Sequence, residues 1–134
     1  MDSIDKVKNA SEVRRLLDRA RSDEGILAVL LFGSHARGEA TPASDIDLCV
    51  VLQPARDAAG DRTRVRLAYL PTKKLDVRLF QQLPLYIRTR VLKEGVVLFC
   101  RDLDVLYELA YRTAKAFNDF QPHYRRYLEQ VAHG

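Results

Sequence analysis

Three aspartates in this 134-residue chain are spaced so that they could hold a metal ion. Asp45 and Asp47 lie two positions apart in the segment DIDLCVVL, and residues at i and i+2 of a strand project from the same face. The two carboxylates would repel each other, and a divalent cation that prefers oxygen ligands would remove this repulsion. Asp76, in the segment LDVRLF, can supply a third carboxylate from another strand. The spacing therefore predicts a Mg2+ site, with Ile46 and Leu48 directed into the core.

Three such carboxylates can hold two Mg2+ ions, one that polarises an attacking hydroxyl group and one that bridges the phosphates of a nucleotide. This is the arrangement that an in-line phosphoryl transfer requires. We assign Asp45 and Asp47 as metal ligands, and Asp76 as a metal ligand and the general base. Taken alone, Asp76 could equally be a surface residue paired with Arg78, and Asp45 could be a turn or capping residue.

A glycine-serine pair precedes the aspartates. Gly33 ends an unbroken apolar run, so a turn without a side chain would bring backbone N–H groups and the Ser34 hydroxyl to phosphate oxygens. The N-terminus of a following helix would add to the attraction, and Arg37 supplies positive charge. We therefore expect Gly33, Ser34 and Arg37 to bind the nucleotide. Taken alone, such a pair is more often an ordinary strand-to-helix turn.

The elements that must position these residues follow from the apolar periodicity of the chain. Strands are expected at 26–32, 46–52, 75–80 and 96–99, and the first of these is apolar throughout, as in a strand covered on both faces. Helices are expected at 11–22, 55–70, 84–93 and 103–131, and the last carries an apolar stripe with a kink or a new start at Pro122. This order predicts an α/β (α+β) fold, a small mixed sheet flanked by helices with a long C-terminal helical segment.

Length and composition restrict the class of protein. The chain fits one domain, 1–134, with a core of about 1–101 and a helical extension of about 102–134. Its net charge is +4, and the segment from Arg56 to Arg78 is locally basic. Such a stretch could attract a nucleotide or RNA, or could be a solvated helix face, and direct nucleic-acid binding is the less favoured interpretation. Neither a signal peptide nor a membrane span is present, so we expect a cytoplasmic protein.

The whole pattern resembles the signature of the DNA polymerase beta nucleotidyltransferase superfamily. Gly33 and Ser34 are followed by ten residues, then by D-x-D, and later by a third aspartate. The extended form G-S-x-A-R-G-x-A-x-x-x-S-D-I-D-L is matched over residues 33–48. The chain is similar to the minimal nucleotidyltransferases over most of its length, including L-P before a helix and the segment E-G-V-V-L-F-C-R-D. This resemblance implies the nucleotidyltransferase fold and ATP as a substrate.

The C-terminal tail bears on the acceptor. Its segment N-D-F-Q-P, residues 118–122, resembles antitoxins that are encoded beside HEPN-domain RNase toxins, and this implies transfer of AMP from ATP to a tyrosine of the toxin. The chain is too short for a separate acceptor domain, so we expect a partner protein and a hetero-complex or oligomer. Aromatic residues in the tail could belong to the core or to an interface: Tyr107, Tyr111, Phe117, Phe120, Tyr124 and Tyr127. Two alternatives stay open, a non-catalytic module that neutralises its partner by contact and transfer to a small molecule such as an aminoglycoside.

Overall fold

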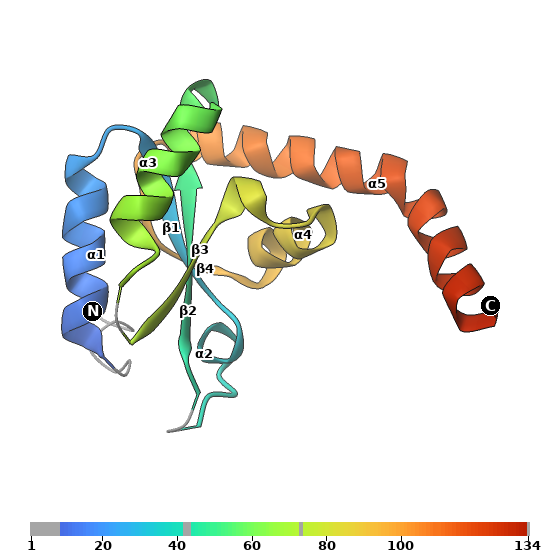
Figure 1. Cartoon of the computed structure of the whole chain (residues 1–134), viewed down its shortest axis with the longest axis horizontal. Coiled ribbons are helices and arrows are strands. Elements are labelled where there is room, and N and C mark those ends of the chain that lie inside the picture. Colours follow the sequence, from blue (N-terminus) through green and yellow to red (C-terminus); the bar gives the residue numbers. More distant parts are fainter. Residues whose placement is uncertain (1–8, 42–43, 73, 134) are drawn as a thin grey trace.

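The computed structural model describes residues 9–41, 44–72 and 74–133 (Figure 1). The elements follow the expected alternation of helices and strands. In chain order they are α1 (Ala10–Ser22), β1 (Ile26–Phe32), α2 (Ser34–Arg37), β2 (Ile46–Leu52), η1 (Pro54–Arg56), α3 (Ala59–Tyr69), β3 (Leu75–Leu79), η2 (Phe80–Gln82), α4 (Leu85–Glu94), β4 (Val96–Cys100) and α5 (Leu103–His133). Each of the four predicted strands is present, and each predicted helix coincides with an observed one.

The four strands form one mixed sheet in the order β3-β2-β1-β4. Strand β1 is antiparallel to both β2 and β4, whereas β2 is parallel to β3. This confirms the predicted small mixed sheet. The third strand is shorter than expected because Phe80, which is fully buried, begins a 3-10 turn instead of continuing the alternation.

Helices cover both faces of this sheet, which explains why β1 and β2 are apolar on both sides. One core cluster joins α1 and α3 to residues such as Ile46, Leu48 and Val50. The other joins α4 and the first turns of α5 to residues such as Cys49 and Val51. Figure 1 accordingly shows α1 and α3 on one side of the strands and α4 and α5 on the other. Side chains that alternate along β2 therefore belong to different layers, which decides the face on which the acidic residues lie.

Helix α5 is the longest element and runs as one helix through the position of Pro122. Figure 1 shows that its axis bends in its C-terminal part, in line with the expected kink rather than with a new helix. Among the described residues, no helix is both long enough and apolar enough to cross a membrane.

The packing face of α5 differs from the predicted stripe. Leu106 and Thr113 are buried, but Leu103 and Phe120, which fit the same apolar period, are exposed. On α5 the core cluster includes Val105, Leu106 and Leu109, whereas Leu103 precedes this part of the helix and Phe120 lies farther along it. Tyr107 and Tyr111 are exposed by 66% and 68%, which excludes a core role within this chain. The side chains of Tyr124 and Tyr127 lie outside the described part.

Candidate active site

Asp47 and Asp76 lie side by side on neighbouring strands. They are register partners in the parallel pair of β2 and β3. Because Ile46 and Leu48 belong to the cluster under α1 and α3, Asp47 between them points to the opposite face, toward the α4 layer. The same alternation places Asp76 on that face, since its neighbours in β3 are buried on the other side. The structure therefore brings two of the three predicted carboxylates together.

The electrostatics of this pair are asymmetric. Partial burial raises the pKa of Asp47 to about 6, and a hydrogen bond to Asp76 with the charges of Asp76 and Asp45 reinforces the rise. The pKa of Asp76 is instead lowered, because the Arg78 guanidinium binds its carboxylate. Arg78 Nε donates to Asp76 Oδ1 at 2.9 Å, and both residues face the same side of β3. Asp76 is thus both paired with Arg78 and placed beside Asp47, so the two interpretations of this residue from the sequence are compatible.

Asp45 stands one residue before β2 begins and is exposed. It is near enough to Asp47 for its charge to raise the pKa of that residue. Among the residues that the structure describes, no three acidic, histidine or cysteine side chains converge as a ready-made metal site. The donors are nevertheless carboxylate oxygens that neighbouring strands bring together at Asp47 and Asp76, and this is the chemistry that Mg2+ requires. The donor set fits the ion, while Asp76 is bound to Arg78 in the structure.

Gly33 is packed directly against Asp47. Its backbone has φ 75° and ψ −154°, a conformation that is essentially restricted to glycine. A Cβ atom at this position would lie 3.2 Å from Cγ of Asp47 and would overlap its Oδ2. Two residues that lie fourteen positions apart in the motif are therefore in contact, and the glycine is required both by its backbone and by the neighbouring carboxylate.

Ser34 and Arg37 are the first and last residues of α2. A helix does follow Gly33, as expected, but it has four residues and supplies the backbone N–H groups of a single turn. Arg37 is exposed and donates to Glu39 through Nε at 2.9 Å. This hydrogen bond is the main cause that raises the pKa of Arg37, and the charge of Asp47 adds a smaller contribution. The turn thus carries Ser34 and Arg37 beside the acidic pair.

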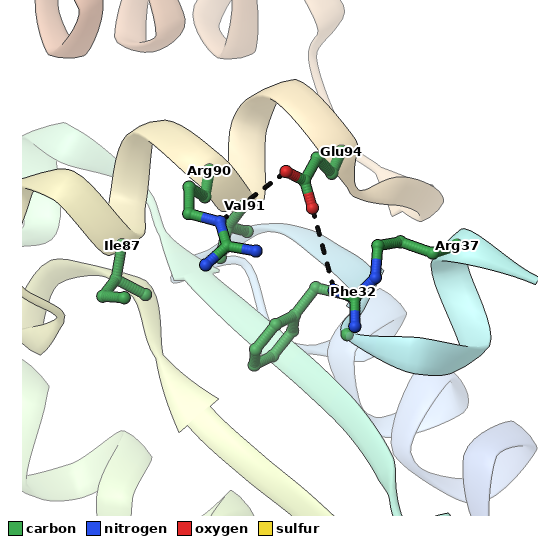
Figure 2. A pocket seen from close by; sticks show the side chains of 7 residues that line it. Phe32, Arg37, Ile87, Arg90, Val91 and Glu94 are labelled. Atoms are coloured by element: carbon green, nitrogen blue, oxygen red, sulfur yellow. Dashed lines mark ion pairs between the residues drawn. The ribbon is translucent and has the colours of Figure 1, made fainter. Parts of the chain in front are cut away.

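A cavity of about 170 Å³ opens beside Gly33, between the end of β1, α2 and α4 (Figure 2). Two arginines on its wall, Arg37 and Arg90, lie on either side of Glu94. The sequence pattern does not single out Arg90 or Glu94, whose only signal is an i, i+4 spacing at the end of the predicted helix, which was expected to stop at Lys93, one residue before Glu94. The full lining is Phe32, Gly33, Arg37, Ile87, Arg90, Val91 and Glu94.

The basic segment after Arg56 is largely neutralised within the chain. Arg62 pairs with Asp57, Arg64 pairs with Asp23, and Lys74 pairs with Glu12. Lys73 lies outside the described residues. These pairs favour the interpretation of a solvated surface over that of an anion-binding stretch.

Comparison with known proteins agrees with this geometry. Residues 15–104 match the family described as polymerase beta, nucleotidyltransferase. A protein of Methanocaldococcus jannaschii named as a protein adenylyltransferase is 32% identical over 100 residues, which cover 75% of this chain and 76% of that protein.

Solved structures extend the likeness to the whole fold. A chain of a crystal structure of a toxin-antitoxin with AMP-PNP superposes with a TM-score of 0.68 at 20% identity, covering 93% of this chain and 99% of that chain. A chain of the complex between tri-AMPylated Shewanella oneidensis HEPN toxin and MNT antitoxin gives a TM-score of 0.62 at 17% identity, covering 91% and 94%. At these identities the likeness shows a shared fold.

Proposed function

Because this chain belongs to the polymerase beta nucleotidyltransferase family, we propose that it transfers AMP from ATP to a tyrosine hydroxyl of a partner HEPN toxin and thereby acts as an antitoxin. The observation that carries the proposal is the contact between Gly33 and Asp47 beside the Asp47–Asp76 pair. The relative named as a protein adenylyltransferase and the similar fold found with AMPylated HEPN toxin support the same acceptor class.

In the proposed reaction the acceptor oxygen forms a bond to the α-phosphorus of ATP, and the bond from that phosphorus to the bridging oxygen breaks. Pyrophosphate leaves, and the hydroxyl proton passes to Asp76. The Arg78 guanidinium lowers the pKa of Asp76 and weakens it as a base. Proton acceptance by Asp76 therefore requires Arg78 to release the carboxylate.

Asp45, Asp47 and Asp76 would hold Mg2+, with two ions expected. When bound, the metal supplies a positive charge that neutralises the acids, polarises the attacking hydroxyl and offsets the charge of the phosphates. Gly33, Ser34 and Arg37 would orient the phosphates. Their backbone N–H groups, hydroxyl and guanidinium all lie at the turn that adjoins Asp47. A cytoplasmic location is part of the same proposal, because ATP is its substrate.

The partner would dock on the surface of α5. Leu103, Tyr107 and Tyr111 follow one another at intervals of four residues and are all exposed, so they form one stripe on the helix. Exposed aromatic residues at helical spacing are enriched in interfaces. A hetero-complex through α5 would bring the acceptor hydroxyl from the partner.

The reaction is tested with α-labelled ATP, Mg2+ and the protein that co-purifies with this chain. The wild-type chain at one-tenth of the partner concentration should label most of the partner and increase its mass by whole AMP units. The Asp45→Ala/Asp47→Ala double variant should leave it unlabelled. Equal labelling by both proteins would refute the mechanism. If the chain instead inhibits its partner only at a stoichiometric ratio and the partner gains no mass, the chain is a binding module. Mass gain on an added aminoglycoside with none on the partner would establish the small-molecule alternative.

A further inference from the structure

The cavity beside Gly33 is lined by two cationic side chains, one more than the turn alone provides, and by one acidic side chain. Arg37 reaches it from α2 and Arg90 from α4, and Figure 2 shows that Glu94 lies between their guanidinium groups. Glu94 Oε1 is 3.8 Å from Arg37 Nη1, and Oε2 is 3.6 Å from Arg90 Nε. Both separations are longer than a charge-assisted hydrogen bond, and all three side chains are partly exposed. Such pairs are weak and exchangeable.

We propose that this cavity binds the β- and γ-phosphates of ATP and then the pyrophosphate leaving group, with Arg90 as a second guanidinium beside Arg37. Glu94 lies at the position that the anion would take between the two guanidinium groups. This inference rests on the proposed function, because the same turn at Gly33 must bind the nucleotide. When the bond between the α-phosphorus and the bridging oxygen breaks, negative charge develops on pyrophosphate, and two guanidinium groups stabilise it.

The position of Arg90 is set by the packing of α4. Val91, the next residue, is buried against β1, and Ile87 packs partly against the same core cluster. A residue on a helix that is anchored in this way is held at a constant distance from the end of β1, where Gly33 begins the turn. Arg90 is therefore better positioned for a phosphate than a residue on a loop would be.

The cavity and the acidic pair belong to one site. Gly33 lines the cavity and is also packed against Asp47. Asp47, Asp76 and α4 lie on the same side of the sheet. A nucleotide with its α-phosphate near the aspartates would thus extend its terminal phosphates along Gly33 toward Arg37 and Arg90.

Glu39 also competes for Arg37, whose Nε it binds at 2.9 Å. Arg90 instead pairs with Glu94, four residues later on the same helix. Removal of the Glu94 charge should therefore free Arg90 more than Arg37. Removal of the Glu94 charge should therefore strengthen anion binding, whereas removal of the Arg90 charge should weaken it. A purely structural ion pair would not give opposite effects.

The test is calorimetric titration of the full chain with inorganic pyrophosphate and with AMP, both in the presence of Mg2+. Arg90→Ala should weaken the binding of pyrophosphate about tenfold while the binding of AMP stays within a factor of about two. Glu94→Gln should strengthen the binding of pyrophosphate about threefold or more. Lys93→Ala, a change of an exposed cation on the same helix, is the matched control and should change neither affinity by more than about twofold.

Three results would overturn the inference. Equal loss of AMP and pyrophosphate binding in Arg90→Ala would mean a general defect of the site, and weaker pyrophosphate binding in Glu94→Gln would mean that Glu94 only positions Arg90. Thermal denaturation of each variant establishes that it is folded. Because pyrophosphate binding needs no acceptor, a dependence on Arg90 can hold even if AMP transfer to a toxin fails. Conversely, normal transfer by Arg90→Ala with unchanged pyrophosphate affinity would refute this inference alone.

Discussion

Gly33 and Asp47 are packed so closely that the Asp47 carboxylate fills the position where a Cβ atom of residue 33 would be. The positive φ of Gly33 adds a second restriction, because L-residues rarely adopt this backbone. The turn and the acidic strand therefore form one unit, and a change at either residue displaces the other. This contact explains why the motif requires glycine at position 33.

Gly33→Ala should consequently damage both stability and activity. Backbone strain of about 1–3 kcal/mol is expected in the free energy of unfolding, together with displacement of Asp47. A displacement on the scale of an ångström would lower the rate of AMP transfer about 100-fold. Urea denaturation and a labelled-ATP assay measure the two effects. Gly38→Ala is the control, since Gly38 also has a positive φ, of 73°, but a Cβ atom added there would meet no atom within 4 Å; it should lose stability and keep most of the activity.

Asp47→Asn should make the metal-free protein more stable at high pH. The pKa of Asp47 is about 6 in the folded chain, above the ordinary value of about 3.9. A raised folded-state pKa means that its stabilising contribution is complete below pH 4 and is lost as the pH rises through 6. The variant should therefore melt like wild type below pH 4 and about 2–4 °C higher at pH 8, a small shift because the group is only partly buried.

Differential scanning calorimetry in chelator, with both proteins compared at each pH, isolates this group from the others. Addition of Mg2+ should stabilise wild type more than the variant, since the ion requires the ionised carboxylate. A lower melting temperature for Asp47→Asn at pH 8 without metal would show that the Asp47 carboxylate is not under repulsion.

Arg78→Gln should raise the affinity of the acidic site for Mg2+. Arg78 holds Asp76 through a 2.9 Å hydrogen bond and competes with a cation for the same oxygens. Because an exposed ion pair contributes at most about 1 kcal/mol, the gain should be about two- to fivefold. Loss of the Arg78 guanidinium also removes the main cause of the lowered pKa of Asp76. Arg78→Gln should therefore be less stable than wild type above the unfolded-state pKa of Asp76. The difference between the two proteins should disappear as the pH falls through the folded-state pKa of Asp76.

Titration with Mg2+, followed by thermal shift, measures this competition. Arg66→Gln, a substitution of an exposed arginine on α3, serves as the control for loss of positive charge. Weaker Mg2+ binding in Arg78→Gln than in this control would mean that Arg78 supports the acidic site instead of competing for it.

The sheet and the acidic face were predictable because their signals are local. Runs that are apolar on both faces identify β1 and β2, and strict alternation in β3 places Asp76 opposite Val77. Arg90 and Glu94 were not predictable, because the face that α4 turns toward Gly33 depends on how Val91 packs against β1. No local pattern distinguishes a helix residue over a cavity from one in solvent.

The error in α5 has a similar cause. Period-3.6 apolar spacing predicts a buried stripe only where another layer covers the helix. Leu106 meets that condition and Phe120 does not, although both fit the period. The sequence also could not decide whether the tyrosines of the tail were core or interface, since this depends on where the sheet ends.

Tyr107→Ala/Tyr111→Ala should separate partner binding from folding. Both side chains are mostly exposed, so the free energy of unfolding should change by less than about 1 kcal/mol. Affinity for the partner should fall about tenfold or more if the stripe is central to the interface. Leu106→Ala is the opposite case, because this residue is 5% exposed and its loss should cost about 2–4 kcal/mol. Unchanged partner affinity in the double tyrosine variant would place the interface elsewhere.

Arg101 should contribute more to stability than any exposed ion pair among the described residues. Its Nε donates to the carbonyl of Ile26 at 2.9 Å, and Nη2 donates to the carbonyls of Ala20, Arg21 and Asp23. One guanidinium at the end of β4 thus binds the last turn of α1 and the start of β1. Positive charge at a helix C-terminus is also favourable.

Arg101→Ala removes all of these hydrogen bonds, and water can replace only part of them because several of the carbonyls are partly buried. The free energy of unfolding should fall by about 2–3 kcal/mol. Arg101→Lys should recover less than half of this loss, since an ammonium group cannot span acceptors on two elements as a planar guanidinium does. Arg112→Ala is the control: it breaks only an exposed i, i+4 pair with Glu108 and should cost less than about 0.5 kcal/mol. Urea denaturation measures the free energy of unfolding of all three variants. Equal midpoints for Arg101→Ala and Arg112→Ala would show that water hydrogen-bonds the freed carbonyls as well as Arg101 does. In that case α1 would be held to the sheet by its apolar face alone.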